Sequence, residues 1–273
     1  MDHIPFSLLV LFPRPVLDRL LAPLRQLALR DTRLFLQLAR SGNLPDPDVD
    51  LRILILGSGL GRHAFCFAQA GATVVAVDPS QVLTDNAKRL AVYESGFAQP
   101  VEFHTADLRH LPGSISPGGG PDGTYHLVLI PDGALCEVGG EEQVRAVFVQ
   151  AVKQLVPGGR LICDVPNPTR IIRNLTEPFS ELLFQVHLPR LYAKRRRSLD
   201  RRAGVLVDQW TVQAETDTKY ELRTRLLELR GLDRMAAECG LWPMDPPYGD
   251  TEEAELGLGL MSPRLIAVYE RRM

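Results

Sequence analysis

Residues 53–63 read Ile53-Leu54-Ile55-Leu56-Gly57-Ser58-Gly59-Leu60-Gly61-Arg62-His63. The apolar run followed by closely spaced glycines predicts a buried strand, a tight turn and the first turn of a helix. Glycine adopts positive φ at little cost and lets the backbone approach a ligand closely. The free amide groups at the start of a helix favour a carboxylate or a phosphate. We therefore expect a ligand site at this turn.

The spacing of the glycines narrows the choice of ligand. Gly57, Gly59 and Gly61 form the pattern GxGxG. The dinucleotide fingerprint requires its third glycine one position later, where this chain has Arg62. The turn alone is a weak signal, because similar turns serve several adenosine-containing cofactors, but its spacing disfavours a nicotinamide or flavin dinucleotide.

A carboxylate follows the second expected strand. That strand, at 73–77, leads into Asp78-Pro79-Ser80, about 20 residues after the glycines. An acid at this place accepts hydrogen bonds from both ribose hydroxyls of an adenosine cofactor. The competing interpretation is that Asp78 caps the helix that begins near Gln81, although Ser80 is also suited to that role.

A second carboxylate, Asp107, follows the third expected strand and precedes Leu108. Ligands of open α/β sheets bind outside the carboxyl ends of the strands. There, Asp107 can accept from an adenine amino group while the backbone N–H of its neighbour meets a ring nitrogen. Without the two earlier motifs, Asp107 would be read as an ordinary loop acid.

Short apolar runs alternate with helical segments through the middle of the chain. The expected strands are 51–56, 73–77, 101–104, 126–130 and 160–165, and the expected helices are 62–69, 82–93 and 141–155. Because the strands are nearly all apolar, this alternation predicts an α/β fold whose parallel sheet is covered by helices on both faces.

The two ends of the chain follow other patterns. Leucines recur at helical spacing over 14–40, where we expect Pro23 to break or kink the helix. After Pro168 the rhythm changes, and alternating polar and apolar residues over 205–229 predict antiparallel strands. A helix over 232–239 and a strand over 264–270 close the chain.

Composition sets limits on function. The 273 residues carry a formal net charge of -2, which argues against a generally basic nucleic-acid binder. The four cysteines form no CxxC pair, so we expect buried thiols and neither a zinc site nor a disulfide framework. The apolar run 4–12 is too short to span a bilayer, and we expect a cytoplasmic protein without a membrane partner.

The ordered set of motifs resembles the class I (Rossmann-like) S-adenosylmethionine-dependent methyltransferases. It comprises the GxGxG turn, Asp78, Asp107, the Pro157-Gly158-Gly159 turn before strand five and a terminal antiparallel hairpin. The likeness covers roughly 31–273 and is nearest to the small-molecule branch, in which strand five runs into a stretch like Asp164-Val165-Pro166-Asn167-Pro168.

The resemblance implies a three-layer α/β sandwich with a mostly parallel seven-stranded Rossmann-like sheet, an N-terminal helical segment and a β-containing insert after strand five. It implies a single methyltransferase domain over 1–273. Its expected parts are a helical N-terminal lid at 1–45, a cofactor-binding core at 46–168, an acceptor-side insert at 169–230, and a terminal helix and strands at 231–273.

The resemblance also implies roles for individual residues. The cofactor is S-adenosylmethionine, with S-adenosylhomocysteine as product, and the glycine turn lies against its methionine part. Asp78 holds the ribose, Asp107 and Leu108 frame the adenine, and the segment 131–135 faces the reacting methyl group. The expected cofactor-binding residues are Gly57, Ser58, Gly59, Gly61, Asp78, Pro79, Asp107, Leu108 and Pro131. Ser58 departs from the family pattern, where Cys or Ala is more usual, and the N-terminal tyrosine-rich motif is absent.

Methyl transfer from a sulfonium is an in-line displacement, so positioning supplies most of the catalysis. A general base is needed only when the acceptor must lose a proton. Asp132 is the candidate for that base or for orienting the acceptor, and a turn-forming role beside Gly133 is equally open. Asp132, Leu135 and Tyr248 are the candidate acceptor contacts, and no cluster has metal-ligand spacing.

Three functions therefore compete. The first is transfer of a methyl group to an O, N or C atom of a small-molecule acceptor by a monomer or homodimer. The second is methylation of RNA or protein through the basic run at 194–202, although we expect no nucleic-acid partner, because such a run is usually a solvated face. The third is a non-catalytic partner or scaffold of the same fold. A nicotinamide dehydrogenase ranks last.

Overall fold

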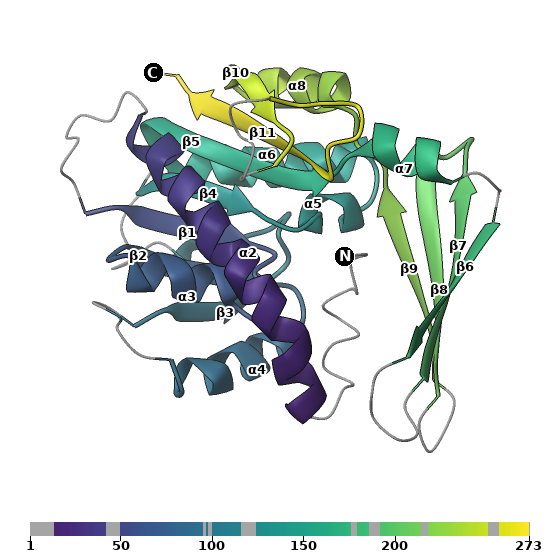
Figure 1. The fold of residues 1–273 in the computed structure, drawn as a ribbon. Coiled ribbons are helices and arrows are strands. Elements are labelled where there is room, and N and C mark those ends of the chain that lie inside the picture. The colour runs from purple at the N-terminus through teal and green to yellow at the C-terminus, as the bar shows by residue number, and fades with distance from the viewer. Residues whose placement is uncertain are drawn as a thin grey trace.

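The computed structural model describes residues 14–41, 50–94, 97, 100–115, 124–175, 179–185, 192–213, 218–250 and 257–272. The apolar run 4–12 and the glycines at 118–120 lie outside these residues. Two sheets are present (Figure 1), one of seven strands in the order β10-β11-β5-β4-β1-β2-β3 and one of four in the order β6-β7-β8-β9.

The seven-stranded sheet consists of β1 (Arg52–Leu56), β2 (Thr73–Asp78), β3 (Glu102–Thr105), β4 (Tyr125–Ile130), β5 (Leu155–Pro166), β10 (Leu241–Tyr248) and β11 (Arg264–Arg271). Only β11 runs antiparallel to its neighbours. The predicted α/β fold with a mostly parallel seven-stranded sheet is confirmed. The strand β10 forms the terminal antiparallel hairpin with β11 that the resemblance implies, but the residue pattern did not locate it, because its three prolines are unusual in a strand.

Helices cover both faces of this sheet (Figure 1), as the all-apolar strands require. One face packs on α2 (Arg14–Arg40), α3 (Arg62–Gln69) and α4 (Gln81–Ala91). The other packs on α5 (Ala134–Glu137), α6 (Glu141–Gln154) and α8 (Leu229–Glu238). Strand β1 serves both cores, because Ile53 and Ile55 point to the first and Leu54 and Leu56 to the second.

The strand order reverses between β1 and β4. From β1 the chain proceeds through β2 and β3 toward one edge, and from β4 it proceeds to β5 on the other side. The connections after β1 and β4 therefore diverge and leave a crevice at the carboxyl ends of these strands. This position is where the glycine turn and the segment 131–135 meet.

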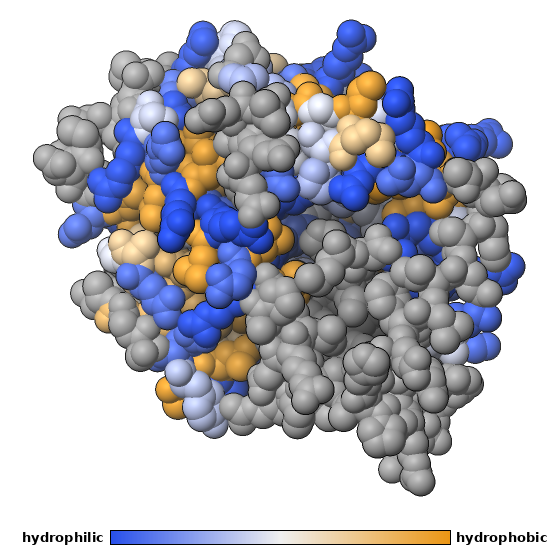
Figure 2. All heavy atoms as spheres, viewed as in Figure 1, coloured by the Kyte–Doolittle hydropathy of each residue, from blue (hydrophilic) through white to orange (hydrophobic). Residues whose placement is uncertain are grey.

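The helix α2 continues through Pro23, so the predicted break is wrong, and the alternative of a kink stays a prediction. A proline removes only one backbone hydrogen bond of a helix. From Ala28 to Ala39, buried residues recur at helical spacing toward the sheet. Figure 2 shows hydrophilic side chains on the outward side of this helix. No helix among the described residues has the length and apolar character needed to cross a membrane.

The four-stranded sheet is antiparallel and follows α7 (Pro168–Asn174), as the alternating pattern after Pro168 predicts. It comprises β6 (Phe179–Gln185), β7 (Tyr192–Asp200), β8 (Val205–Gln213) and β9 (Thr218–Arg225). The basic run starting at Lys194 lies in the interior strand β7. There Arg195 is buried, and Arg197 donates to both carboxylate oxygens of Asp208 at 2.7 and 2.6 Å.

A buried charge network fastens α2 to the sheet. Arg264 on β11 donates to Asp31 on α2 at 2.8 and 3.1 Å and to Asp164 on β5 at 2.9 Å. His63 on α3 lies 3.1 Å from the same Asp31 carboxylate. Burial alone would raise the pKa of Asp31, but hydrogen bonds from His63 and Arg264 outweigh it and hold the pKa below its ordinary value.

Replacing Arg264 should unfold the protein more easily. The variant Arg264→Leu leaves two buried carboxylates without their shared cation, so we expect the free energy of unfolding to fall by about 3–5 kcal/mol in urea titrations. Arg223→Leu is the matched control on another strand. Its side chain is 60% exposed beside Glu221, and its loss should cost less than about 1 kcal/mol. Equal losses in the two variants would contradict a structural role for the network.

Candidate functional site

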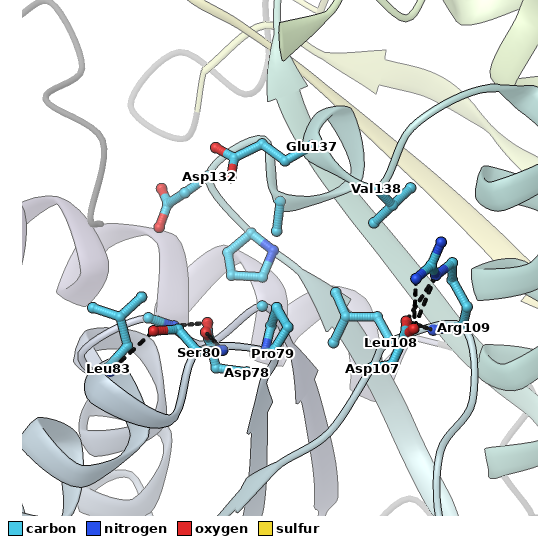
Figure 3. Close-up of a pocket in the computed structure, with 14 residues that line it drawn as sticks. Asp78, Pro79, Ser80, Leu83, Asp107, Leu108, Arg109, Asp132, Glu137 and Val138 are labelled. Carbon is cyan, nitrogen blue, oxygen red and sulfur yellow. Dashed lines mark hydrogen bonds and ion pairs between the residues drawn. The ribbon is translucent and has the colours of Figure 1, made fainter. Parts of the chain in front are cut away.

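A cavity of about 440 Å³ opens at the carboxyl ends of β1, β2 and β4 (Figure 3). Its volume lies within the range of about 300–1,000 Å³ that small-ligand sites occupy. The lining residues are Gly57, Gly59, Asp78, Pro79, Ser80, Leu83, Asp107, Leu108, Arg109, Pro131, Asp132, Ala134, Glu137 and Val138. Seven of the nine residues predicted to bind a cofactor are among them.

The glycine turn is folded back onto β2. The N–H groups of Gly57 and Ser58 both donate to the carbonyl oxygen of Val77, at 2.8 and 3.0 Å. Gly57 has a φ of +80°, and a Cβ at this position would overlap the Cβ of Ala134. Ser58 and Gly61 complete the turn through the bond from the Gly61 N–H to the Ser58 carbonyl, 2.9 Å, but neither lines the cavity.

Asp78 joins the glycine turn to the end of β2. Its Oδ2 accepts from the Gly59 N–H at 2.8 Å, and its Oδ1 accepts from the Ser80 N–H at 2.9 Å. Burial raises the pKa of Asp78, and the two N–H groups offset only part of that rise. The helix-capping role falls to Ser80, whose Oγ accepts from the Leu83 N–H at 3.3 Å. Asp78 is thus held in the cavity wall by the backbone.

Asp107 stands across the cavity, paired with Arg109. The guanidinium donates to both carboxylate oxygens, at 2.6 to 3.1 Å, and the Arg109 N–H donates at 2.9 Å. These bonds from the Arg109 side chain and backbone lower the pKa of Asp107. Leu108 beside it is 4% exposed and supplies an apolar wall. Arg109 was not predicted as a site residue, because an arginine in a loop is ordinary.

Asp132 lines the cavity as a member of an ion pair. Its Oδ2 accepts from Arg62 Nε at 3.1 Å, and its Oδ1 accepts from Arg62 Nη2. Both side chains are nearly buried, with exposed fractions of 10% and 6%. Asp132 has a φ of 56°, the only positive value for a non-glycine residue in the described part of the chain. Its roles as base or acceptor contact stay predictions, and the geometry adds that Arg62 neutralises it.

The other two predicted acceptor contacts lie outside the cavity. Leu135 is fully buried in the core under α5 and α6, and Tyr248 packs at the end of β10 against the opposite core. The sequence placed Leu135 correctly after β4, but the turn at Gly133 points it inward. Tyr248 is removed from the cavity because β10 occupies the far edge of the sheet.

Comparison with known proteins agrees with this geometry. Residues 53–159, which run from β1 into β5, match the protein family described as "Methyltransferase domain". No curated protein matches the sequence.

Solved structures show that the likeness extends beyond residues 53–159. The methyltransferase CcbJ from Streptomyces caelestis has a TM-score of 0.74 at 20% identity, over 90% of each chain. The sugar N-methyltransferase KedS8 from Streptoalloteichus sp ATCC 53650 has 0.65 at 16%, over 89% of this chain and 87% of that one. CalS10, an amino pentose methyltransferase from Micromonospora echinaspora solved with SAM bound, has 0.62 at 18%, over 88% and 90%. At these identities the likeness shows a shared fold over nearly the whole chain.

Glu137 is a cavity residue that sequence reasoning missed. It ends the short helix α5, and it lines the cavity with part of its side chain exposed to solvent. Partial loss of solvation and, secondly, the negative charge of Asp78 raise the pKa of Glu137 to about 7. The only available signal was its place in the first helical turn after β4. Among the described residues, no group of three or more His, Cys, Asp or Glu side chains is arranged to hold a metal ion.

The close approach of Gly57 to Ala134 should affect the free energy of unfolding when Gly57 is replaced. Gly57→Ala forces a Cβ against Ala134 at positive φ, whereas Gly71→Ala adds a Cβ at φ +91° with no atom within 4 Å. We expect the control Gly71→Ala to lower the free energy of unfolding by about 1–2 kcal/mol, because alanine is strained at a positive φ. Gly57→Ala should cost about 1–3 kcal/mol more in the same urea titrations. Equal costs would show that the turn does not need this contact.

The raised pKa of Glu137 predicts a pH-dependent stability. Its pKa is about 7 in the folded protein against 4.5 for an ordinary glutamate, so the folded state binds the proton more tightly. The protonated Glu137 carboxyl therefore adds to the free energy of unfolding. This contribution is complete below about pH 4.5 and is lost as the pH rises through about 7. Glu137→Gln should therefore raise the Tm more at pH 8 than at pH 5. The exposed control Glu142→Gln should show no such trend, and equal behaviour of the two variants would refute the pKa assignment.

Proposed function

We propose that the protein is an S-adenosylmethionine-dependent methyltransferase that methylates a small-molecule acceptor and releases S-adenosylhomocysteine. The observation that carries the proposal is the shared cavity. Chain segments around Gly57, Asp78, Asp107 and Pro131 are far apart in sequence, yet they line one space at the switch point of the sheet. Adenosine cofactors bind at such places.

The cavity residues suit this cofactor in chemical type. Asp78 retains further acceptor capacity toward two ribose hydroxyls, because each carboxylate oxygen can accept more than one hydrogen bond and uses one for a backbone N–H. The Cβ-free edge of Gly57 and Gly59 leaves room for the methionine part. Leu108 and Leu83 give apolar surface, and Asp107 offers an acceptor for an adenine amino group.

The protein itself contributes to catalysis by positioning the acceptor relative to the cofactor. When bound, the cofactor supplies an electrophilic methyl group on a sulfonium. The protein fixes the approach line of the acceptor and keeps water out, which is where most rate enhancement in such a displacement arises. Pro131, Asp132 and Glu137 follow β4 and line the cavity.

Two observations support a small-molecule acceptor. KedS8 and CalS10 are named as methyltransferases that act on a sugar and on an amino pentose, and both share the fold over nearly the whole chain. Two cations of the basic run are withdrawn from a phosphate partner, because Arg195 is 4% exposed and Arg197 is paired with Asp208, whereas Lys194, Arg196, Arg201 and Arg202 are exposed. Phosphate binding needs accessible cations along a groove.

Calorimetric titration tests the cofactor. We expect the protein to bind S-adenosylmethionine and S-adenosylhomocysteine in the micromolar range and not to bind NADH. Asp78→Asn should weaken both sulfur ligands by about 10- to 100-fold, since hydrogen bonds to a charged group contribute about 1.5–3 kcal/mol. The control Asp85→Asn changes an exposed acid on α4 and should leave both affinities unchanged.

Failure of the folded wild-type protein to bind either sulfur ligand would refute the proposed function and favour a scaffold role. Binding that is equally strong in wild type and Asp78→Asn would keep the cofactor but remove the assigned ribose contact.

A further inference from the structure

Arg62 connects the cavity to helix α2. It is the first residue of α3 and directly follows Gly61, the last glycine of the turn. From there Arg62 Nε and Nη2 donate to the carboxylate of Asp132, which lines the cavity. Arg62 Nη1 donates to the Leu24 carbonyl of α2 at 2.8 Å. A single guanidinium, on a residue that is 7% exposed, therefore joins a cavity side chain to the helix outside it.

The shape of the guanidinium makes this connection rigid. Its N–H groups lie in one plane at fixed angles to one another, so a shift of the Leu24 carbonyl turns the same plane that holds Asp132. The backbone of Asp132 has a φ of 56°, in the left-handed region that side chains disfavour. Such a conformation persists only where surrounding contacts maintain it. The pair with Arg62 is one of these contacts.

His63, the next residue of α3, forms a second connection between α2 and Asp132. Its Nε2 lies 3.1 Å from the carboxylate of Asp31 on α2, and its Nδ1 lies 3.7 Å from Asp132 Oδ2. The residue is 3% exposed. Figure 1 shows α2 lying across α3, and the two helices are in contact. Two consecutive side chains of α3 thus link the position of Asp132 to that of α2.

Two other buried arginines attach α2 without involving the cavity. Arg160 on β5 donates to the Leu38 carbonyl near the C-terminal end of α2 at 2.6 Å, and Arg264 on β11 holds Asp31 in the middle of the helix. Neither of these acceptors lines the cavity. The contact at Leu24 is different, because its arginine also holds a cavity carboxylate.

Asp132 lies where the amino-acid part of the proposed cofactor would be. Figure 3 shows Asp132 and Asp107 on opposite sides of the cavity. With the ribose at Asp78 and the adenine at Asp107, the methionine part extends away from Asp107 and toward Asp132. That part carries an ammonium group, for which a carboxylate is a strong hydrogen-bond acceptor. Ligand affinity would then depend on where Asp132 is held.

We propose that Arg62 is a positioning residue, which fixes Asp132 for ligand binding while α2 is docked. This inference rests on the proposed function, because its ligand is the cofactor named there. Docking of α2 and binding of the cofactor then favour each other, since Arg62 has both partners only in the docked state. Coupling of this kind is reciprocal, so it can be measured from either side.

Two measurements on the whole chain test the coupling. The first is the calorimetric affinity for S-adenosylhomocysteine, and the second is hydrogen exchange of the α2 amides at 24–31 with and without that ligand. In wild type we expect the ligand to slow this exchange by about fivefold or more. Arg62→Leu should weaken binding by about tenfold and abolish the slowing. Arg62→Lys should recover part of the affinity without the slowing, because an ammonium lacks the planar fork.

A double-mutant cycle tests whether Arg62 acts through Asp132. Asp132→Asn should also weaken S-adenosylhomocysteine by about tenfold. The double variant should bind no more weakly than the worse single variant, because both substitutions remove the same contact. Additive losses would show that Arg62 affects binding by another route, and they would overturn the inference.

Arg160→Leu is the matched control. It removes an arginine that is 4% exposed and donates to another carbonyl of α2. We expect faster exchange at the C-terminal end of α2 in the absence of ligand. The affinity for S-adenosylhomocysteine and the ligand-dependent slowing at 24–31 should stay as in wild type. An equal loss of affinity in Arg160→Leu and Arg62→Leu would show that only the stability of α2 matters, which contradicts a specific role for Arg62.

The outcomes separate the two proposals. If wild type does not bind S-adenosylhomocysteine, the proposed function fails and the inference falls with it. If wild type and Arg62→Leu bind it equally well, the proposed function stands and the role of Arg62 is overturned. Should Arg62→Leu fail to fold, Arg62→Lys decides the question, because wild-type affinity together with wild-type slowing in that variant would also overturn the role.

Discussion

The site depends on one connection, between the end of β2 and the glycine turn after β1. Asp78 accepts the Gly59 N–H, and Val77 accepts the N–H groups of Gly57 and Ser58. These bonds hold the turn against the end of β2, where Gly57 approaches Ala134 too closely to carry a side chain. Since β1 is also the switch point of the strand order, the turn faces a crevice instead of a neighbouring connection.

The carboxylates around this crevice differ in whether an arginine pairs with them. Behind it, Arg264 joins Asp31 and Asp164 and fixes α2 against the sheet. At its edge, Arg62 neutralises Asp132. Pairing of this kind makes a carboxylate structural, because moving it would leave a cation buried alone. Among the described residues, Glu137 has no such cationic partner, unlike Asp132 and Asp164.

The antiparallel insert packs beside the seven-stranded sheet through α5. Its antiparallel sheet reaches α5 through β9, and on its most basic strand, β7, Arg195 is buried and Arg197 pairs with Asp208. A cation that pairs inside a sheet is unavailable to a phosphate backbone. Part of the basic run in the sequence therefore serves contacts within the insert.

The sequence alone determined the strand–helix alternation, the glycine turn and the two acids that end β2 and β3. These features depend on local periodicity and on residues next to the strands that carry them. Only the tertiary structure decided which residues share the cavity. It turned Leu135 into the core, moved Tyr248 to the far edge, joined Arg62 to Asp132 across 70 positions, and exposed Glu137 to the site. Such relations depend on how distant segments pack, and local pattern carries no record of that packing.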